Sequence, residues 1–147
     1  MPRLDNSIDI KAPRDKVFDY VSNIETHPEW VKWAKDAEAT SPDRKGVGAT
    51  DVMVMQVGPR KETVEAIVTE YKEGELFTRR HTRGMEMTDR KALVSLGEVT
   101  KFAWSIEYKP PMGMMGKAMD ALFVATLFNQ LMEDSLTILK DRIENAR

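Results

Sequence analysis

Residues 4–11 alternate between apolar and polar side chains, which is the period of a half-buried strand. The row that is apolar apart from one asparagine comprises Leu4, Asn6, Ile8 and Ile10. Beyond Pro13, which the first turn of a helix tolerates, apolar residues recur at helical spacing and predict a short helix to about Ser22. A second short helix is predicted within 23–30, with Thr26 as its cap and with Trp30 and Trp33 on one face.

The stretch 34–108 has the pattern of about six strands separated by turn sequences. The turns are 42–46, 58–59, 72–75, Gly84 and 97–98. Connections this short join antiparallel neighbours, because a parallel crossover needs a dozen or more residues. The last of these strands has a bulky row that we expect to face inward, made of Phe102, Trp104, Ile106 and Tyr108.

Residues from about Pro111 to Asn145 are predicted to form one long helix, because no proline or glycine follows Gly116. Its core stripe, at about 100° per residue, is Ala118, Ala121, Ala125, Phe128, Met132, Leu136, Leu139 and Ile143. The whole chain therefore reads as an α+β fold. About seven antiparallel strands are combined with two short helices after the first strand and a long C-terminal helix.

The start of this helix is apolar on a second side as well. That second side carries Met112, Met115, Met119, Leu122 and Phe123. Such a surface needs a cover, which could be a loop, a ligand, a membrane surface or another subunit. Membrane contact ranks lowest, because only Lys109 and Lys117 are basic near these residues. We therefore expect these residues to cover a cavity mouth or to form a homodimer contact.

Composition narrows the class of protein. The 147 residues, 41% of them hydrophobic and 31% charged, are suited to a single globular domain over 1–147. The absence of cysteine excludes disulfides, zinc–thiolate sites and thiol nucleophiles. A net charge of -2 gives no reason to expect a nucleic-acid partner. No apolar stretch approaches the ~20 residues of a membrane span, so we expect a cytoplasmic protein without stable membrane insertion.

Candidate chemistry is sparse. The two histidines, His27 and His81, have no companions at metal-ligand spacing, so neither a metal nor a cofactor is expected. His27 is interpreted as a capping or surface residue. Arg79 and His81 share one face of strand 76–82, and period alone does not show whether that face points inward. If it does, the two could orient or protonate a carbonyl; if not, strand arginines of this kind pair with glutamates across the sheet.

Several segments resemble the START-like superfamily, also called SRPBCC, which includes polyketide cyclase/dehydrase-type, coenzyme Q-binding and birch-pollen-allergen-like proteins. They are 7–21, 28–30, 68–71 and 104–108, the last followed by a proline and the helix. The resemblance spans nearly the whole chain and implies a helix-grip fold. In that fold a curved sheet wraps around the C-terminal helix and encloses a largely apolar cavity that holds a lipid, quinone or polyketide. Fold alone does not establish activity.

Within that implied fold, the residues expected to contact a ligand are the inward-facing apolar and aromatic ones, with the alternative that they simply fill a solid core. They are Trp30 and Trp33 at the mouth, then Val64, Ala66, Val68, Phe102, Trp104, Ile106, Tyr108, Met115, Met119 and Phe123. Two functions follow as alternatives: binding of a hydrophobic small molecule, or a cyclase/dehydratase acting in the same cavity. A weaker third is an interaction domain that uses the Met-rich helix start. A Tyr or Trp donor alone in the cavity favours binding, whereas an inward Arg, His or carboxylate with a shifted pKa favours chemistry.

Overall fold

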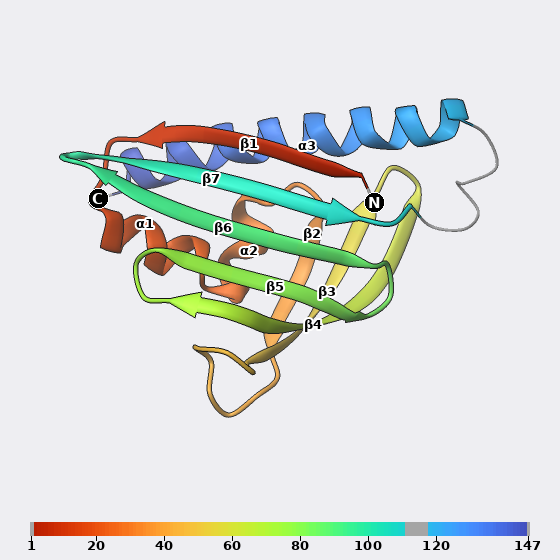
Figure 1. The fold of residues 1–147 in the computed structure, drawn as a ribbon, viewed down its shortest axis with the longest axis horizontal. Helices are drawn as coiled ribbons and strands as arrows, with labels where there is room; N and C mark the ends of the chain where they lie inside the picture. Colours follow the sequence, from red (N-terminus) through yellow and green to blue (C-terminus); the bar gives the residue numbers. More distant parts are fainter. Residues whose placement is uncertain (1, 111–117, 147) are drawn as a thin grey trace.

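The computed structural model describes residues 2–110 and 118–146. The order of elements along the chain is that expected from the sequence (Figure 1). The strands are β1 (Arg3–Ile10), β2 (Ala34–Ala39), β3 (Thr50–Val57), β4 (Arg60–Lys72), β5 (Leu76–Arg83), β6 (Met87–Leu96) and β7 (Val99–Tyr108). The helices are α1 (Arg14–Val21), the 3-10 turn η1 (Ile24–Thr26), α2 (His27–Trp30) and α3 (Ala118–Glu144).

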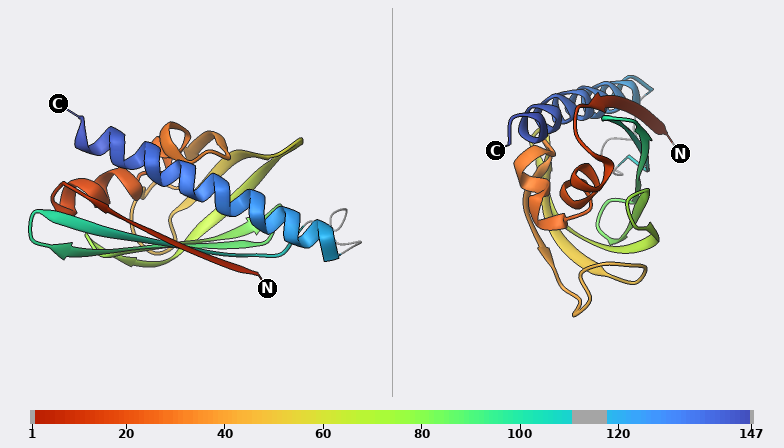
Figure 2. Two further views of the ribbon diagram at one scale, coloured as in Figure 1. Left: turned by 90° about the horizontal axis from the view of Figure 1, so that it is seen from above. Right: turned by 90° about the vertical axis from the view of Figure 1, so that its left-hand side faces the viewer.

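The seven strands form one antiparallel sheet in the order β1-β7-β6-β5-β4-β3-β2. Strands β2 to β7 follow one another through turns of two or three residues, except for the longer connection 40–49 between β2 and β3, and β1 joins the far side of β7. The sheet curls, with α1 inside the curl and α3 along its open side (Figure 2). This arrangement confirms the expected helix-grip α+β fold.

Alternation along the strands decides which side chains face inward. Val64, Ala66 and Val68 on β4 are buried, as expected. The predicted inner row of β7 is buried too, and it consists of Phe102, Trp104, Ile106 and Tyr108. On β5 the inward row is Phe77, Arg79 and His81, which resolves the ambiguity left by the sequence.

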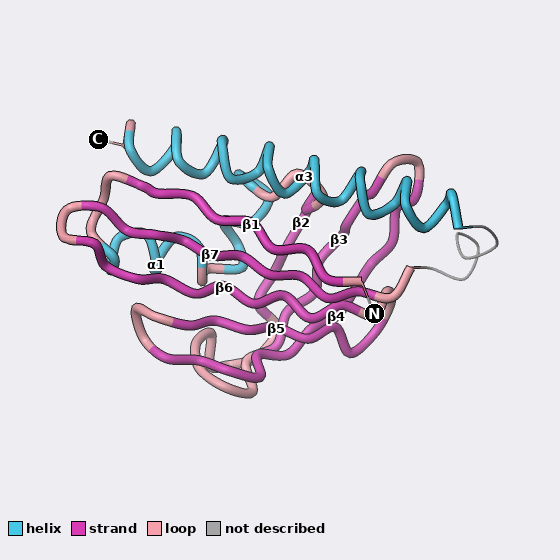
Figure 3. Tube along the Cα trace, turned by 45° about the horizontal axis from the view of Figure 1, so that its top comes forward, coloured by secondary structure: helices cyan, strands magenta, loops and turns pink. Residues whose placement is uncertain are grey.

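Helix α3 runs alongside β1 through most of its length (Figure 3). Asn6 Nδ2 donates to Asn129 Oδ1 at 2.9 Å, and Lys140 Nζ donates to the carbonyl of Asp9 at 2.7 Å. The buried positions of α3, from residue 121 onward, are Val124, Phe128, Met132, Ser135, Leu136, Leu139 and Ile143. The predicted stripe is correct from Phe128 onward, but Ala121 is exposed because the first turns of α3 extend beyond the sheet. The predicted helical segment 111–117 lies outside the described residues.

The two short helices follow β1, and their local details differ from expectation. Thr26 does not cap α2 through its side chain; its hydroxyl donates instead to the carbonyls of Tyr20 and Asn23. His27 is buried, with 1% exposure, and is therefore not a surface residue. Its Nδ1 lies 3.0 Å from the Asn23 carbonyl, whereas its Nε2 has no hydrogen-bond partner among the described residues. Within the described ranges no helix is both long and apolar enough to span a bilayer.

Candidate functional site

A cluster of charged side chains lies buried on the inner face of the sheet. Its members are Asp51 on β3, Arg79 on β5, and Asp89 and Lys91 on β6, each at most 4% exposed. Strand register explains the convergence. Arg79 of β5 lies opposite Asp89 of β6 on one side and opposite Val68 of β4 on the other, and β4 in turn pairs with β3, which carries Asp51. The inward-facing rows of three strands therefore bring two cations and two anions together.

Arg79 is held by carboxylates on both sides. Its Nη2 and Nε donate to the two oxygens of Asp51 at 2.6 and 2.9 Å, and its Nη1 donates to Asp89 Oδ2 at 3.4 Å. Burial disfavours the charged guanidinium, but the two carboxylates together outweigh burial and raise the pKa of Arg79. The bidentate pair fixes the plane of the guanidinium. Arg79 is consequently a paired charge, with a hydrogen bond from each of its three nitrogens to a carboxylate.

Asp89 accepts three hydrogen bonds at the centre of the cluster. Besides Arg79, Lys91 Nζ donates to its Oδ2 and Trp104 Nε1 to its Oδ1, both at 2.6 Å. Burial alone would raise the pKa of this carboxyl, but Lys91 and Arg79 reverse the effect and lower it to about 2. Burial lowers the pKa of Lys91, and the charge of Arg79 acts in the same direction. Asp89 is therefore ionised throughout the physiological range.

Lys91 occupies an aromatic environment. Its Nζ lies 5.5–5.9 Å from the ring centroids of Phe77, Trp30 and Trp104. These are cation–π distances, and the ring faces partly replace the hydration that a fully buried ammonium loses. The charged cluster and the aromatic interior thus meet at this residue.

Aromatic rings continue from this point in an unbroken series toward α3. Successive centroid distances are 5.2 Å for Trp30–Trp104, 5.2 Å for Trp104–Trp33, 5.4 Å for Trp33–Phe128 and 4.9 Å for Phe128–Tyr108. Trp30 and Trp33, which the sequence placed at a cavity mouth, are instead buried inside this series. The hydroxyl of Tyr108 and the indole nitrogen of Trp30 have no hydrogen-bond partner among the described residues. Both groups are potential donors facing the interior.

Both histidines are buried near the charged cluster. Burial lowers the pKa of His27 far below its usual value, and the charges of Lys91 and Arg79 add to this. His81 Nδ1 lies 2.7 Å from the carbonyl of Met85, and burial followed by the charge of Arg79 lowers the pKa of His81. Both rings are consequently neutral at pH 7. In each ring Nδ1 is assigned the proton, because it faces a carbonyl that only accepts.

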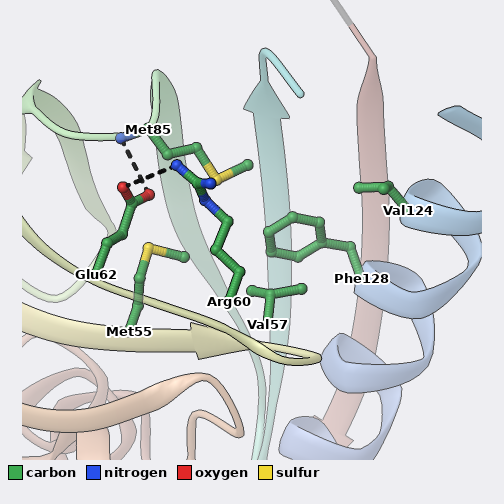
Figure 4. Close-up of a pocket in the computed structure, with 7 residues that line it drawn as sticks. All are labelled: Met55, Val57, Arg60, Glu62, Met85, Val124 and Phe128. Atoms are coloured by element: carbon green, nitrogen blue, oxygen red, sulfur yellow. Dashed lines mark hydrogen bonds and ion pairs between the residues drawn. The ribbon is translucent and has the colours of Figure 1, made fainter. Parts of the chain in front are cut away.

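A pocket opens at the end of the molecule where the β3–β4 turn faces α3 (Figure 4). It is lined by Met55, Val57, Arg60, Glu62, Met85, Val124 and Phe128. The space measures about 290 Å³ when the part open to solvent is included, and its enclosed part is only about the size of one water molecule. Among the described residues, its wall is apolar except for the pair Arg60–Glu62. Phe128 links this pocket to the aromatic series, and Met85 links it to His81.

The structure brings together most of the residues that the sequence singled out as ligand contacts, but inside the core rather than around the pocket. The buried members are Trp30, Trp33, Val64, Ala66, Val68, Phe102, Trp104, Ile106 and Tyr108. Phe123 is 66% exposed on the outer side of α3. Met115 lies outside the described residues, and so does the side chain of Met119. Arg79 and His81 face inward, yet neither lines the pocket. Ligand contact by any of these residues stays a prediction.

Sequence reasoning missed Asp51, Asp89 and Lys91, as well as the pocket residues at the β3–β4 turn. The pattern of β6 contained the signal, because Asp89 and Lys91 alternate with Met87 and Leu93 on one face. Charged residues in an otherwise apolar row indicate a buried pair. Within the described residues no group of three or more histidine, aspartate or glutamate side chains is placed to hold a metal ion.

The curled antiparallel sheet closed by one long helix defines the helix-grip class of α+β proteins. The family model described as "Polyketide cyclase / dehydrase and lipid transport" matches residues 1–144, so this chain belongs to that family. A comparison with curated proteins gives no match.

Solved structures of the same fold include TTHA0849 from Thermus thermophilus, with a TM-score of 0.82, 17% identity and 97% of each chain covered. A START superfamily protein from Mycobacterium smegmatis has a TM-score of 0.81, 15% identity and 99% of each chain covered. The Zhui aromatase/cyclase from a Streptomyces species has a TM-score of 0.81 and 10% identity, covering 97% of this chain and 93% of its own. At these identities the likeness concerns the fold alone.

Proposed function

We propose that this chain works as a single domain that binds a hydrophobic small molecule of the lipid, quinone or polyketide type between the sheet and α3. The observation that carries the proposal is the apolar pocket between the β3–β4 turn, Met85 and α3. Met55 and Met85 make its wall adaptable, because the methionine side chain is flexible and polarizable. Ligand entry requires these side chains to move, since the enclosed space is narrow.

A larger ligand would extend from this pocket along the aromatic series. Phe128 belongs to both, and the unpartnered Tyr108 hydroxyl and Trp30 indole nitrogen offer donors to a ligand oxygen there. The contacts proposed on this route are Trp30, Trp33, Phe102, Trp104 and Tyr108, together with Val64, Ala66, Val68 and Ile106. Tyr and Trp donors in an apolar site are suited to holding a ligand without changing it.

The test is a titration of the purified protein with a soluble quinone, followed by quenching of tryptophan fluorescence. We expect saturable quenching in the parent protein and weaker binding in Val57→Phe, which fills the pocket with a larger side chain. Val94→Phe is the matched control, because Val94 is 55% exposed on β6 and distant from the pocket wall. Equal affinity in all three proteins would contradict the assigned pocket. Native mass spectrometry of freshly purified protein would identify a co-purified ligand.

A second candidate function is cyclase or dehydratase chemistry on the same ligand. One observation favours it: Arg79, His81, Asp89 and Lys91 all face inward, and each has a shifted pKa. His81 is the best-placed acid–base candidate, because its carbonyl partner Met85 lines the pocket. Incubation with a poly-β-ketone thioester and mass analysis for loss of water tests this function. Turnover abolished by His81→Gln with binding retained would support it, and absence of turnover by the parent protein would contradict it.

We also propose that the start of the C-terminal helix, with Met115, Met119 and Phe123, either covers the pocket mouth or contacts a second copy of the chain. The supporting observation is the exposure of Leu122 (69%) and Phe123 (66%) on α3, next to the pocket residue Val124. Two large apolar side chains left in water favour an occupant for this face.

A further inference from the structure

Among the described residues that line the pocket, Arg60 is the one with a cationic side chain, and its guanidinium has spare donors. It is the first residue of β4, directly after the β3–β4 turn, and its side chain is 48% exposed. Its single partner in the described part of the chain is Glu62, with Nη2 and Oε2 3.5 Å apart. A guanidinium carries five N–H donors, so this one long contact leaves most of them available.

Glu62 pairs with Arg60 and is itself hydrogen-bonded to the backbone of the pocket wall. Its Oε1 accepts a hydrogen bond from the backbone N–H of Met85 at 3.3 Å, and its side chain is 22% exposed. The carboxylate is thereby anchored to the pocket wall. Figure 4 shows the guanidinium lying over the pocket between Glu62 and Met85, with the apolar side chains of Val57 and Phe128 close by.

A ligand in this pocket therefore meets an apolar interior and, at one end, hydrogen-bond donors on a cation. An anionic group can accept several of these donors at once, because a carboxylate matches the fork of a guanidinium. A cationic group gains less, because Arg60 repels it and both oxygens of Glu62 already accept hydrogen bonds. The polarity of the pocket thus distinguishes between ligands with the same tail.

We propose that the pocket takes a single-chain anionic amphiphile, with its carboxylate on Arg60 and its tail between Met55, Met85 and Phe128. This inference rests on the proposed binding function and adds a ligand class and an orientation, head at the β3–β4 turn and tail inward. Lys61 provides a matched control. It is adjacent and carries the same charge, but alternation along β4 turns it away from the inner face, and it is exposed.

The experiment measures the affinities of decanoate, decanol and decyltrimethylammonium, below their micelle concentrations, for the parent protein, Arg60→Gln and Lys61→Gln. We expect the parent to bind decanoate more tightly than the other two. Arg60→Gln should weaken decanoate about fivefold, an effect that corresponds to one half-exposed ion pair, and should leave decanol unchanged. Lys61→Gln should match the parent. Added salt should weaken decanoate binding alone.

The outcomes separate this inference from the function it rests on. Equal affinity for decanoate and decanol, or equal loss of decanoate affinity in both variants, would overturn the role of Arg60 while leaving apolar binding in place. A preference for the ammonium probe would overturn it as well and would implicate Glu62. Failure of all three probes to bind the parent protein would overturn both proposals. Circular dichroism of the variants, compared with the parent, confirms that any change is not a loss of fold.

Discussion

Four charged side chains share the interior with aromatic rings, and each is tolerated there because it has a partner. Replacing a buried ion pair by well-packed apolar residues is often neutral or stabilising, so these charges are poorly explained as a source of stability. They do specify strand register, since Arg79 reaches Asp51 and Asp89 only if β3, β5 and β6 are aligned as observed. Removing one partner is a different matter, because it leaves the others buried and unpaired.

Arg79→Met is expected to lower the free energy of unfolding by about 3–5 kcal/mol, because Asp51 loses its bidentate partner and Asp89 loses one of its two cations. Urea denaturation followed by circular dichroism measures this change. Arg83→Met is the control, since the Arg83 side chain is 81% exposed and its contact with Glu65 is 3.5 Å long. A loss in Arg79→Met no larger than that in the control would show that the cluster relaxes without its arginine.

The buried histidines predict a pH dependence of stability. The pKa of His27 in the folded protein lies well below 6.5, so below pH 6.5 the unfolded chain binds a proton that the folded chain does not. The free energy of unfolding therefore falls as the pH falls, by up to about 1.4 kcal/mol per pH unit for each such histidine. His81, whose folded pKa is also lowered, acts in the same direction.

Asp89, with its pKa lowered from 3.8 to about 2, adds a further loss of stability only when the pH falls below 3.8. Chemical denaturation at a series of pH values measures the slope. His27→Gln should reduce the slope between pH 6.5 and 4, and His81→Gln should reduce it less, because its ring is less completely buried. An unchanged slope in His27→Gln would show that this imidazole is accessible to protons in the folded protein.

At the scale of elements, the local sequence pattern predicted the order and type of the strands and helices. It failed where a feature depends on contacts between residues far apart in the sequence. Alternation identified the inner rows of β4 and β7 because one-face burial is a local property. It left β5 undecided, because the carboxylates that pair with the inward-facing Arg79 lie on β3 and β6, 28 and 10 residues away along the chain. The capping role given to the Thr26 side chain was wrong. Its hydroxyl is oriented by donating to the carbonyls of Tyr20 and Asn23, and it accepts no hydrogen bond from the first turn of α2.

The turn between β5 and β6 shows how a single backbone position fixes an element next to the pocket. Gly84 has φ +87°, and a Cβ there would meet Val64 Cγ1 at 2.7 Å. Gly84→Ala should therefore destabilise the protein by about 2 kcal/mol, through left-handed strain and a clash. Gly97, with φ +83° and no atom within 4 Å of such a Cβ, isolates the strain alone, and Gly97→Ala should cost about half as much. Equal melting temperatures for the two variants would show that Val64 moves freely.

At the scale of the molecule, the pocket is assembled from parts that no local pattern connects: the β3–β4 turn, Met85 between β5 and β6, and α3. The sequence predicted a hydrophobic interior correctly, because apolar rows must face one another in a two-layer fold. It left open whether the aromatic side chains line a cavity or fill the interior, and in the structure they fill most of it. The volume of the side chains decides how much of the interior is filled, and the extension of α3 beyond the sheet decides where space remains open. Both depend on tertiary packing.

The exposed apolar side of α3 lies at this same end and gives the last prediction. Replacing Leu122 and Phe123 by glutamate should leave the free energy of unfolding within about 0.5 kcal/mol of the parent, because both side chains are more than half exposed. If this side covers the pocket mouth, quinone uptake weakens while the mass in solution stays the same. If it contacts a second copy, light scattering shows a smaller particle, since two carboxylates cannot be buried in an apolar contact without a large cost. Unchanged uptake together with an unchanged mass would show that these residues have no partner. The same readouts on Met115→Glu with Met119→Glu extend the test to residues earlier in the sequence.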